Sequence, residues 1–184
     1  FIVPGFVDAL VHGGAGAEVM DASVESIHAI ARSHGRFGTT ALCCGTVASP
    51  LDHLSEVLRV VGHVVRNPAE DGARVLGSYV EGLFGVPEKR GAHPREHLVP
   101  PTIDTFLRLW EASHGTIRVL SYAPEADADL ALTRHLRERC EELGSIVAAM
   151  GHTNASYDLA RRAVDAGIRR ATHLFNAMSG LHQR

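Results

Sequence analysis

Short apolar stretches alternate with longer amphipathic stretches along the chain. The apolar stretches are rich in Val, Ile, Leu and Thr and cover residues 2–11, 39–47, 74–80, 117–122, 145–150 and 170–174. The amphipathic stretches repeat their apolar positions every three to four residues, as helices do, and cover residues 23–33, 51–65, 103–113, 127–143 and 157–166. This alternation predicts an α/β protein with a parallel sheet and helical crossovers.

Two architectures fit this order of elements, an open doubly wound sheet and a (β/α)8 TIM-type barrel. The glycine-rich stretch after the first strand begins with His12 and lacks the GxGxxG spacing, which weakens the dinucleotide-binding alternative. A barrel instead places its active site where the strands end. Polar and ionisable residues stand at the expected strand ends: Asp8, His12, Glu81, Glu125, His152, His173 and Asn176. We therefore favour the barrel.

Six strand–helix units cannot close an eight-stranded barrel. Residues 1–184 are therefore interpreted as part of a single barrel domain that is incomplete in this chain. The chain begins with Phe1 inside an apolar stretch. It stops at Arg184, soon after the stretch that contains the candidate residues His173 and Asn176. We expect the native protein to be longer at both ends.

Composition narrows the classes of partner. Lys and Arg together number 18 against 21 Asp and Glu, a net charge of -3, which gives no basic surface for nucleic acid or an anionic membrane. No apolar stretch approaches the ~20 residues of a membrane helix, and no secretion signal opens the chain. The three cysteines form no CxxC motif. These features predict a cytoplasmic protein that binds neither nucleic acid nor membrane.

One carboxylate and two imidazoles give the strongest chemical indication. Glu81, His152 and His173 each follow a different predicted strand, and this set of residue types suits a catalytic zinc with a fourth position left for water. Their spacing alone is weak, because no two of them lie in one short motif. The alternative is a pair of separately hydrogen-bonded histidines, with Glu81 salt-bridged to an arginine.

The residues around this set carry a family resemblance over essentially the whole chain. In order and separation, the motifs resemble those of the N-acetylglucosamine-6-phosphate deacetylases of the amidohydrolase superfamily. They are PGFVD at 4–8, HGG at 12–14, EGLF at 81–84, KRGAHP at 89–94, APE at 123–125, GHTNA at 151–155 and THLFNAM at 172–178.

The resemblance implies individual roles at the reacting centre. Glu81, His152 and His173 match the family's metal ligands, and His93 matches a histidine that contacts the substrate near the scissile amide. A bound metal polarises the amide carbonyl or lowers the pKa of the attacking water, and His93 is suited to donate to the developing oxyanion. The family's general base is an aspartate that we expect beyond residue 184.

The resemblance also implies how the sugar phosphate is held. Asn176 and Ala177 match residues that bind the sugar phosphate. Arg184 falls where the family places a phosphate-binding arginine that reaches across a dimer interface. A guanidinium suits phosphate because it presents planar paired donors. The resemblance thus implies a homodimer, and a small β-domain beside the barrel that is mostly missing from this chain.

One departure bears on the number of metals. Members of the superfamily often carry His-x-His after the first strand, whereas this chain reads Leu10, Val11, His12. Leucine cannot ligate a metal, so His12 remains a further candidate but a second metal site is disfavoured. We expect one divalent metal ion per subunit, with zinc the best match to the ligand types.

The function implied is removal of acetate from N-acetyl-D-glucosamine 6-phosphate in amino-sugar catabolism, giving D-glucosamine 6-phosphate. Two alternatives stay open. One is another amidohydrolase, such as a deaminase or a cyclic-amide hydrolase, and the other is a non-catalytic barrel that binds a sugar phosphate.

Overall fold

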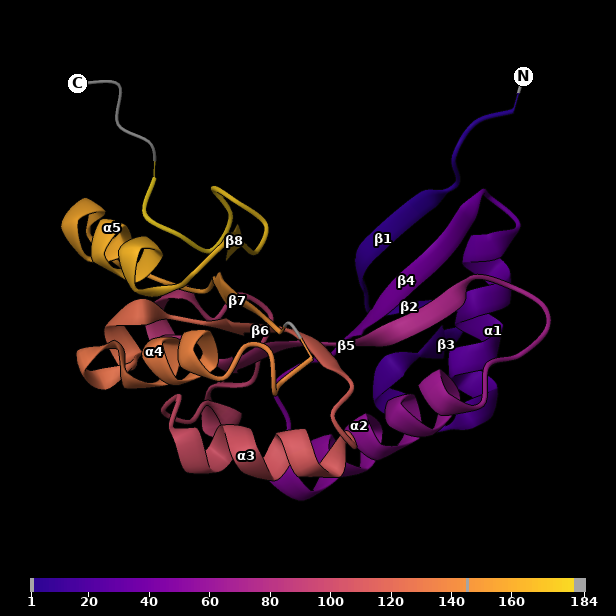
Figure 1. The fold of residues 1–184 in the computed structure, drawn as a ribbon, viewed down its shortest axis with the longest axis horizontal. Helices are drawn as coiled ribbons and strands as arrows, with labels where there is room; N and C mark the ends of the chain where they lie inside the picture. Colours follow the sequence, from indigo (N-terminus) through magenta and orange to yellow (C-terminus); the bar gives the residue numbers. More distant parts are fainter. Residues whose placement is uncertain (1, 145, 181–184) are drawn as a thin grey trace. The chain divides into compact units, whose positions relative to one another are not determined.

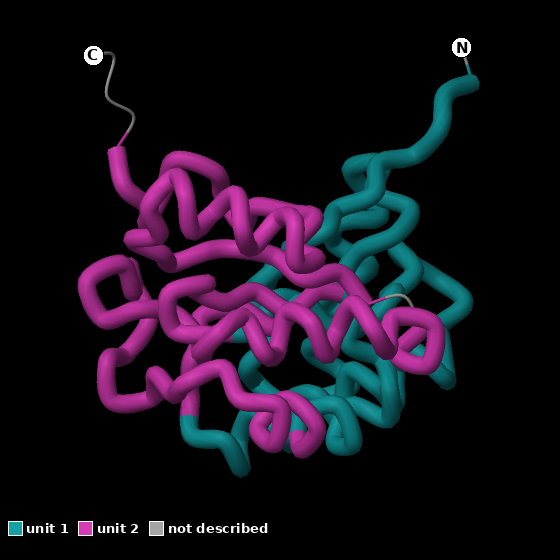
Figure 2. The backbone as a smooth tube through the Cα atoms, turned by 60° about the vertical axis from the view of Figure 1, so that its left-hand side comes forward, with its two compact units in different colours: residues 1–46, 50–79, 109–118 teal, residues 47–49, 80–108, 119–184 magenta. Residues whose placement is uncertain are grey.

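The computed structural model describes residues 2–144 and 146–180. The chain divides into two compact units, coloured separately in Figure 2. Unit 1 comprises Phe1–Thr46, Pro50–Tyr79 and Leu109–Arg118, and unit 2 comprises Val47–Ser49, Val80–Arg108 and Val119–Arg184. Among the described residues, no helix is long and apolar enough to cross a membrane.

Six strands form one sheet, and their order in the sheet is their order in the chain (Figure 1). The pairs β1–β4, β4–β5, β6–β7 and β7–β8 are parallel. These strands are β1 (Phe6–Val11), β4 (Thr39–Gly45), β5 (Arg74–Phe84), β6 (Ile117–Tyr122), β7 (Val147–Met150) and β8 (Arg170–Ala171). The predicted α/β class with a parallel sheet is confirmed. The short antiparallel pair β2 (Gly13–Gly14) and β3 (Ala17–Glu18) was not predicted.

The helices follow the predicted amphipathic stretches. They are α1 (Val24–Gly35), α2 (Leu51–Arg66), α3 (Ile103–Ala112), α4 (Ala131–Glu138) and α5 (Tyr157–Ala166). Serine side chains cap the N-termini of α1 and α5, where the Ser23 hydroxyl accepts from the Ser26 amide and the Ser156 hydroxyl accepts from the Leu159 amide. Helix α5 ends at Ala166 and is followed by Gly167, whose φ of 148° few other residues adopt.

The core of unit 1 lies between its two helices and its strands. Leu42 and Cys44 are two residues apart on β4, so they face the same side of the sheet. Both belong to one buried hydrophobic cluster with Ile27 of α1 and Val57 of α2. Both cysteines of β4, Cys43 and Cys44, are buried and form no disulfide.

Two elements of unit 2 depart most from their predicted bounds. Within the helix predicted over residues 127–143, only α4 is an α-helix. It cannot begin earlier, because Asp129 and Leu130 have φ values of 53° and 55°. The buried Asp127 carboxylate explains where α4 begins, since it accepts from the amides of Leu132 and Thr133. The strand predicted over residues 74–80 continues to Phe84. The carboxylate predicted to follow that strand therefore lies within it.

A candidate metal centre in unit 2

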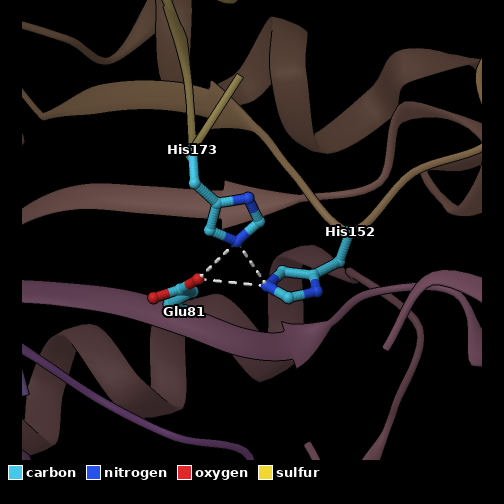
Figure 3. Close-up of side chains that lie close together, drawn as sticks. All are labelled: Glu81, His152 and His173. Carbon is cyan, nitrogen blue, oxygen red and sulfur yellow. Dashed lines mark hydrogen bonds and ion pairs between the residues drawn. The ribbon is translucent and has the colours of Figure 1, made fainter. Parts of the chain in front are cut away.

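Three side chains from three strands or strand ends of unit 2 meet at one point (Figure 3). Glu81 lies in β5, and His152 and His173 each come two residues after the last residue of a strand, β7 and β8 respectively. Glu81 Oε1 lies 3.0 Å from His152 Nε2 and 3.0 Å from His173 Nε2. The two Nε2 atoms are themselves 3.0 Å apart. The structure thus brings together all three residues predicted as metal ligands.

The outer nitrogens of both rings are tied to backbone carbonyls. His152 Nδ1 lies 2.8 Å from the carbonyl oxygen of Lys89, and His173 Nδ1 lies 2.9 Å from that of Asn176. A carbonyl oxygen only accepts, so each Nδ1 carries the proton that it donates. In the neutral rings, both Nε2 atoms therefore present lone pairs toward Glu81 Oε1.

This arrangement fits a bound divalent metal. Ligand atoms about 2.0–2.1 Å from a tetrahedral zinc lie about 3.3 Å apart, close to the 3.0 Å sides of the observed triangle. Three lone pairs that converge in this way repel one another unless a cation or a proton lies among them. The side chains of Glu81 and His152 are 4% and 6% exposed, whereas that of His173 is 30% exposed, so solvent reaches the cluster from the side of His173. An open side is typical of catalytic rather than structural metal sites.

Backbone contacts hold the two histidine-bearing loops. His152 and His173 have φ values of 51° and 33°, which few non-glycine residues adopt. The Val86 amide donates to the His152 carbonyl at 3.0 Å, and the Thr153 amide donates to the Ala177 carbonyl at 3.1 Å. The second of these bonds joins the loop after β7 to the loop after β8.

His93 lies against the same cluster. Its Nε2 is 3.2 Å from His152 Nε2, and the residue is 6% exposed. The Ala48 amide donates to its Nδ1 at 3.4 Å, so in the neutral ring the proton sits on Nε2. The tautomer of His93 is thus opposite to that of His152, with a donor rather than a lone pair facing the cluster.

The predicted phosphate-binding residues are only partly described. Asn176 is exposed, and its side-chain amide donates to the Leu174 carbonyl at 3.5 Å. Ala177 is half-buried with a φ of 49°. Arg184 lies outside the described residues.

The residues discussed for a second metal lie in unit 1. Leu10 belongs to β1, and the ring of His12 is hydrogen-bonded through Nδ1 to the Gly45 carbonyl at 3.2 Å. The three-residue metal cluster found among the described residues includes neither of them.

Two residues of the site were not predicted to orient its ligands. Lys89 holds the His152 ring through its carbonyl, while its ammonium donates to the Met178 carbonyl at 2.8 Å. Asn176, expected only to bind substrate, orients the His173 ring through its backbone. Backbone contacts of this kind depend on the folded path of the chain, and only the position of these residues within the KRGAHP and THLFNAM motifs could have suggested them.

Together, the parallel α/β fold and the cluster of one carboxylate and two imidazoles, which lie in a strand or just after one, are typical of metal-dependent hydrolases. No family model matches the chain. Individual proteins do. The chain is 35% identical over 187 residues to an N-acetylglucosamine-6-phosphate deacetylase of Bacillus subtilis and 34% identical over 183 residues to an N-acetylgalactosamine-6-phosphate deacetylase of Escherichia coli O157:H7. Both alignments cover 100% of this chain, but 46% and 47% of the relatives.

A solved structure agrees with the sequence relatives. An N-acetyl-D-glucosamine-6-phosphate deacetylase mutant from Mycobacterium smegmatis, in complex with N-acetyl-D-glucosamine 6-phosphate, superposes with a TM-score of 0.89 at 33% identity. The match covers 99% of this chain and 45% of that one. The chain is therefore homologous to N-acetylglucosamine-6-phosphate deacetylases along its length, and it spans about half the length of the curated relatives it matches.

Proposed function

We propose that the protein containing this chain hydrolyses the acetamide of N-acetyl-D-glucosamine 6-phosphate to D-glucosamine 6-phosphate and acetate, in amino-sugar catabolism. The convergence of Glu81, His152 and His173 carries the proposal, since each Nε2 is turned inward by a bond from Nδ1 to a carbonyl. The three residues would hold one divalent metal ion, for which zinc suits the ligand types best. Such an ion polarises the amide carbonyl or activates water when it is bound.

The chain's own residues prepare the site for this reaction. Lys89 and Asn176 fix the two imidazole rings through their carbonyls, so the ligand nitrogens need not reorient. His93 presents an Nε2 proton beside the cluster and would donate it as a hydrogen bond to the oxygen of the tetrahedral intermediate. A donor of this kind contributes roughly 3 kcal/mol to the stabilisation of a transition state.

The phosphate of the substrate is proposed to lie beyond the exposed end of the cluster. Asn176 and Ala177 lie three and four residues after His173 in the loop after β8, so they would hold the sugar phosphate close to the metal ligands. Arg184 would pair with the phosphate across the interface of a homodimer. We place the general base, an aspartate, outside this chain.

The strand order supports a (β/α)8 barrel as the complete domain. In a doubly wound sheet the strand order reverses at a switch point, whereas the six strands here keep the order of the chain. Right-handed crossovers in one constant direction place all the helices on one side of the sheet, as a barrel requires. We propose that residues 1–184 belong to one such barrel domain of a longer, cytoplasmic protein.

Acetate release by the full-length, zinc-loaded protein tests the proposal. We expect N-acetyl-D-glucosamine 6-phosphate to yield acetate, and removal of the metal with a chelator to abolish the release. Ammonia release from an aminated substrate would favour a deaminase. Binding of the sugar phosphate without turnover in the metal-loaded protein would favour the non-catalytic alternative.

The 4-epimer of the substrate is a second candidate, because the Escherichia coli relative is named for N-acetylgalactosamine 6-phosphate and is about as similar as the Bacillus subtilis one. The ratio of kcat/KM for the two sugars decides between them. We expect the glucosamine derivative to be preferred.

A further inference from the structure

Glu125 joins two connections that follow neighbouring strands of unit 2. It lies in a short 3-10 turn, Pro124–Ala126, directly after β6, and the Ala123 amide anchors this turn by donating to the Phe84 carbonyl at 3.0 Å. Its Oε2 accepts from the Thr153 hydroxyl, and its Oε1 accepts from the Asn154 amide, both at 2.5 Å. Both carboxylate oxygens are therefore used on the two residues that follow His152.

The backbone at His152 needs such support. Its φ of 51° is sterically disfavoured for a residue with a Cβ, so the conformation persists only if the surrounding contacts determine it. Thr153 is buried at 4% exposure, and its hydroxyl also accepts from the Ala155 amide at 2.9 Å. The hydroxyl thus connects Glu125 to the turn that leads into α5.

We propose that Glu125 is a positioning residue for the metal centre. Through Thr153 and Asn154 it fixes the backbone of His152, and thereby the point at which His152 Nε2 meets Glu81 Oε1. Glu125 itself belongs to no metal-ligating cluster found among residues 2–144 and 146–180. This inference rests on the proposed metal-dependent function, and it adds a residue that acts on the metal only through the ligand loop.

Zinc affinity of the full-length protein tests this role without any substrate. The affinity is measured by competition with a chromophoric chelator for the wild type, Glu125→Ala and Glu125→Gln. Loss of a group that orients a metal ligand typically weakens metal binding about 10–100-fold, which we expect for Glu125→Ala. Glutamine can accept from the Asn154 amide and donate to the Thr153 hydroxyl, so Glu125→Gln should recover most of the affinity.

Thr153 provides a second, independent variant. Thr153→Val removes the buried hydroxyl without changing the shape of the side chain and should weaken zinc binding, whereas Thr153→Ser keeps the hydroxyl and should not. If Glu125→Ala fails to fold, this pair alone decides the question. Glu138→Ala, at an exposed carboxylate near the end of α4, is the matched control and should bind zinc as the wild type does.

The visible absorption of the cobalt-substituted protein adds a readout that a general loss of stability would not move. We expect Glu125→Ala to change the cobalt spectrum at temperatures well below its Tm. Wild-type zinc affinity and cobalt spectrum in folded Glu125→Ala, or in Thr153→Val, would overturn the inference, as would a Glu125→Gln variant as weak as the alanine variant. Deacetylation is not measured in this experiment, so a protein that binds zinc but releases no acetate would refute the proposed function alone.

Discussion

Replacement of His173 by alanine is the most direct perturbation of the candidate metal centre. It removes one of three atoms that form a triangle with 3.0 Å sides and leaves Glu81 and His152 in place. Apparent binding energies of zinc in four-ligand protein sites are about 10–16 kcal/mol, or roughly 2.5–4 kcal/mol per ligand. At about 1.4 kcal/mol per power of ten, His173→Ala should raise the Kd for zinc about 100-fold to 1,000-fold.

The measurement is zinc competition with a chelator, followed by acetate release at a zinc concentration that saturates the wild type. We expect the variant to lose turnover in addition to affinity, because the remaining two ligands no longer fix the ion. His63→Ala, at an exposed histidine on α2, is the control and should change neither quantity. Zinc affinity within about threefold of the wild type, together with unimpaired acetate release, would refute the assignment of the ligands.

Three further outcomes are expected. Since Leu10 offers no ligand atom, elemental analysis should find about one tightly bound metal per chain, and two at full occupancy would contradict this. Arg184→Met should raise KM for the phosphorylated sugar strongly and affect the unphosphorylated sugar little; equal effects on both would exclude a phosphate contact. Burial, reinforced by the adjacent Cys43, raises the pKa of the Cys44 thiol to about 12. Iodoacetamide at about pH 8 should therefore leave Cys44 unmodified and label the half-buried Cys140, which peptide mass spectrometry can detect.

Hydrophobic periodicity was enough to predict the class of fold. The helix predicted over residues 157–166 and the strand predicted over residues 117–122 coincide with α5 and β6. Periodicity mispredicts a helix boundary where the hydrogen bonds of a single side chain determine where the helix begins. The first residues of the predicted helix over 127–143 are diverted by the carboxylate of Asp127, which satisfies amides of α4 from outside the helix. Periodicity carries no information about such a bond.

The candidate ligands could be predicted by type and by their places near the strand ends, but their geometry could not. Nothing in the sequence indicates that the Lys89 carbonyl turns the ring of His152, since any residue type has a carbonyl. The sequence does not show the left-handed conformation of His152 and His173 either, because only a small fraction of histidines adopt positive φ, whereas glycine does so readily. The family motifs indicated which residues matter, and the folded loops explain why.

Gly82 follows the candidate ligand Glu81 in β5, and the ring of His93 lies against it. Its φ is 85°, and a Cβ built there would lie 2.5 Å from His93 Nδ1. Gly82→Ala therefore combines a disfavoured backbone conformation, about 1–2 kcal/mol, with overpacking of about 1–3 kcal/mol, and should lower Tm by several degrees.

The ring of His93 has to move to admit the methyl group. With His93 in its proposed role, kcat should then fall more than KM rises, because a hydrogen bond to the reacting oxygen would strengthen in the transition state. Gly180→Ala is the matched control, since a Cβ at Gly180 meets no atom within 4 Å among the described residues, and neither Tm nor kcat should change. Thermal unfolding and steady-state acetate release measure both effects. A Gly82→Ala variant with the wild-type Tm and kcat would mean that activity does not depend on the position of the His93 ring against Gly82. The donor role proposed for His93 would then be refuted.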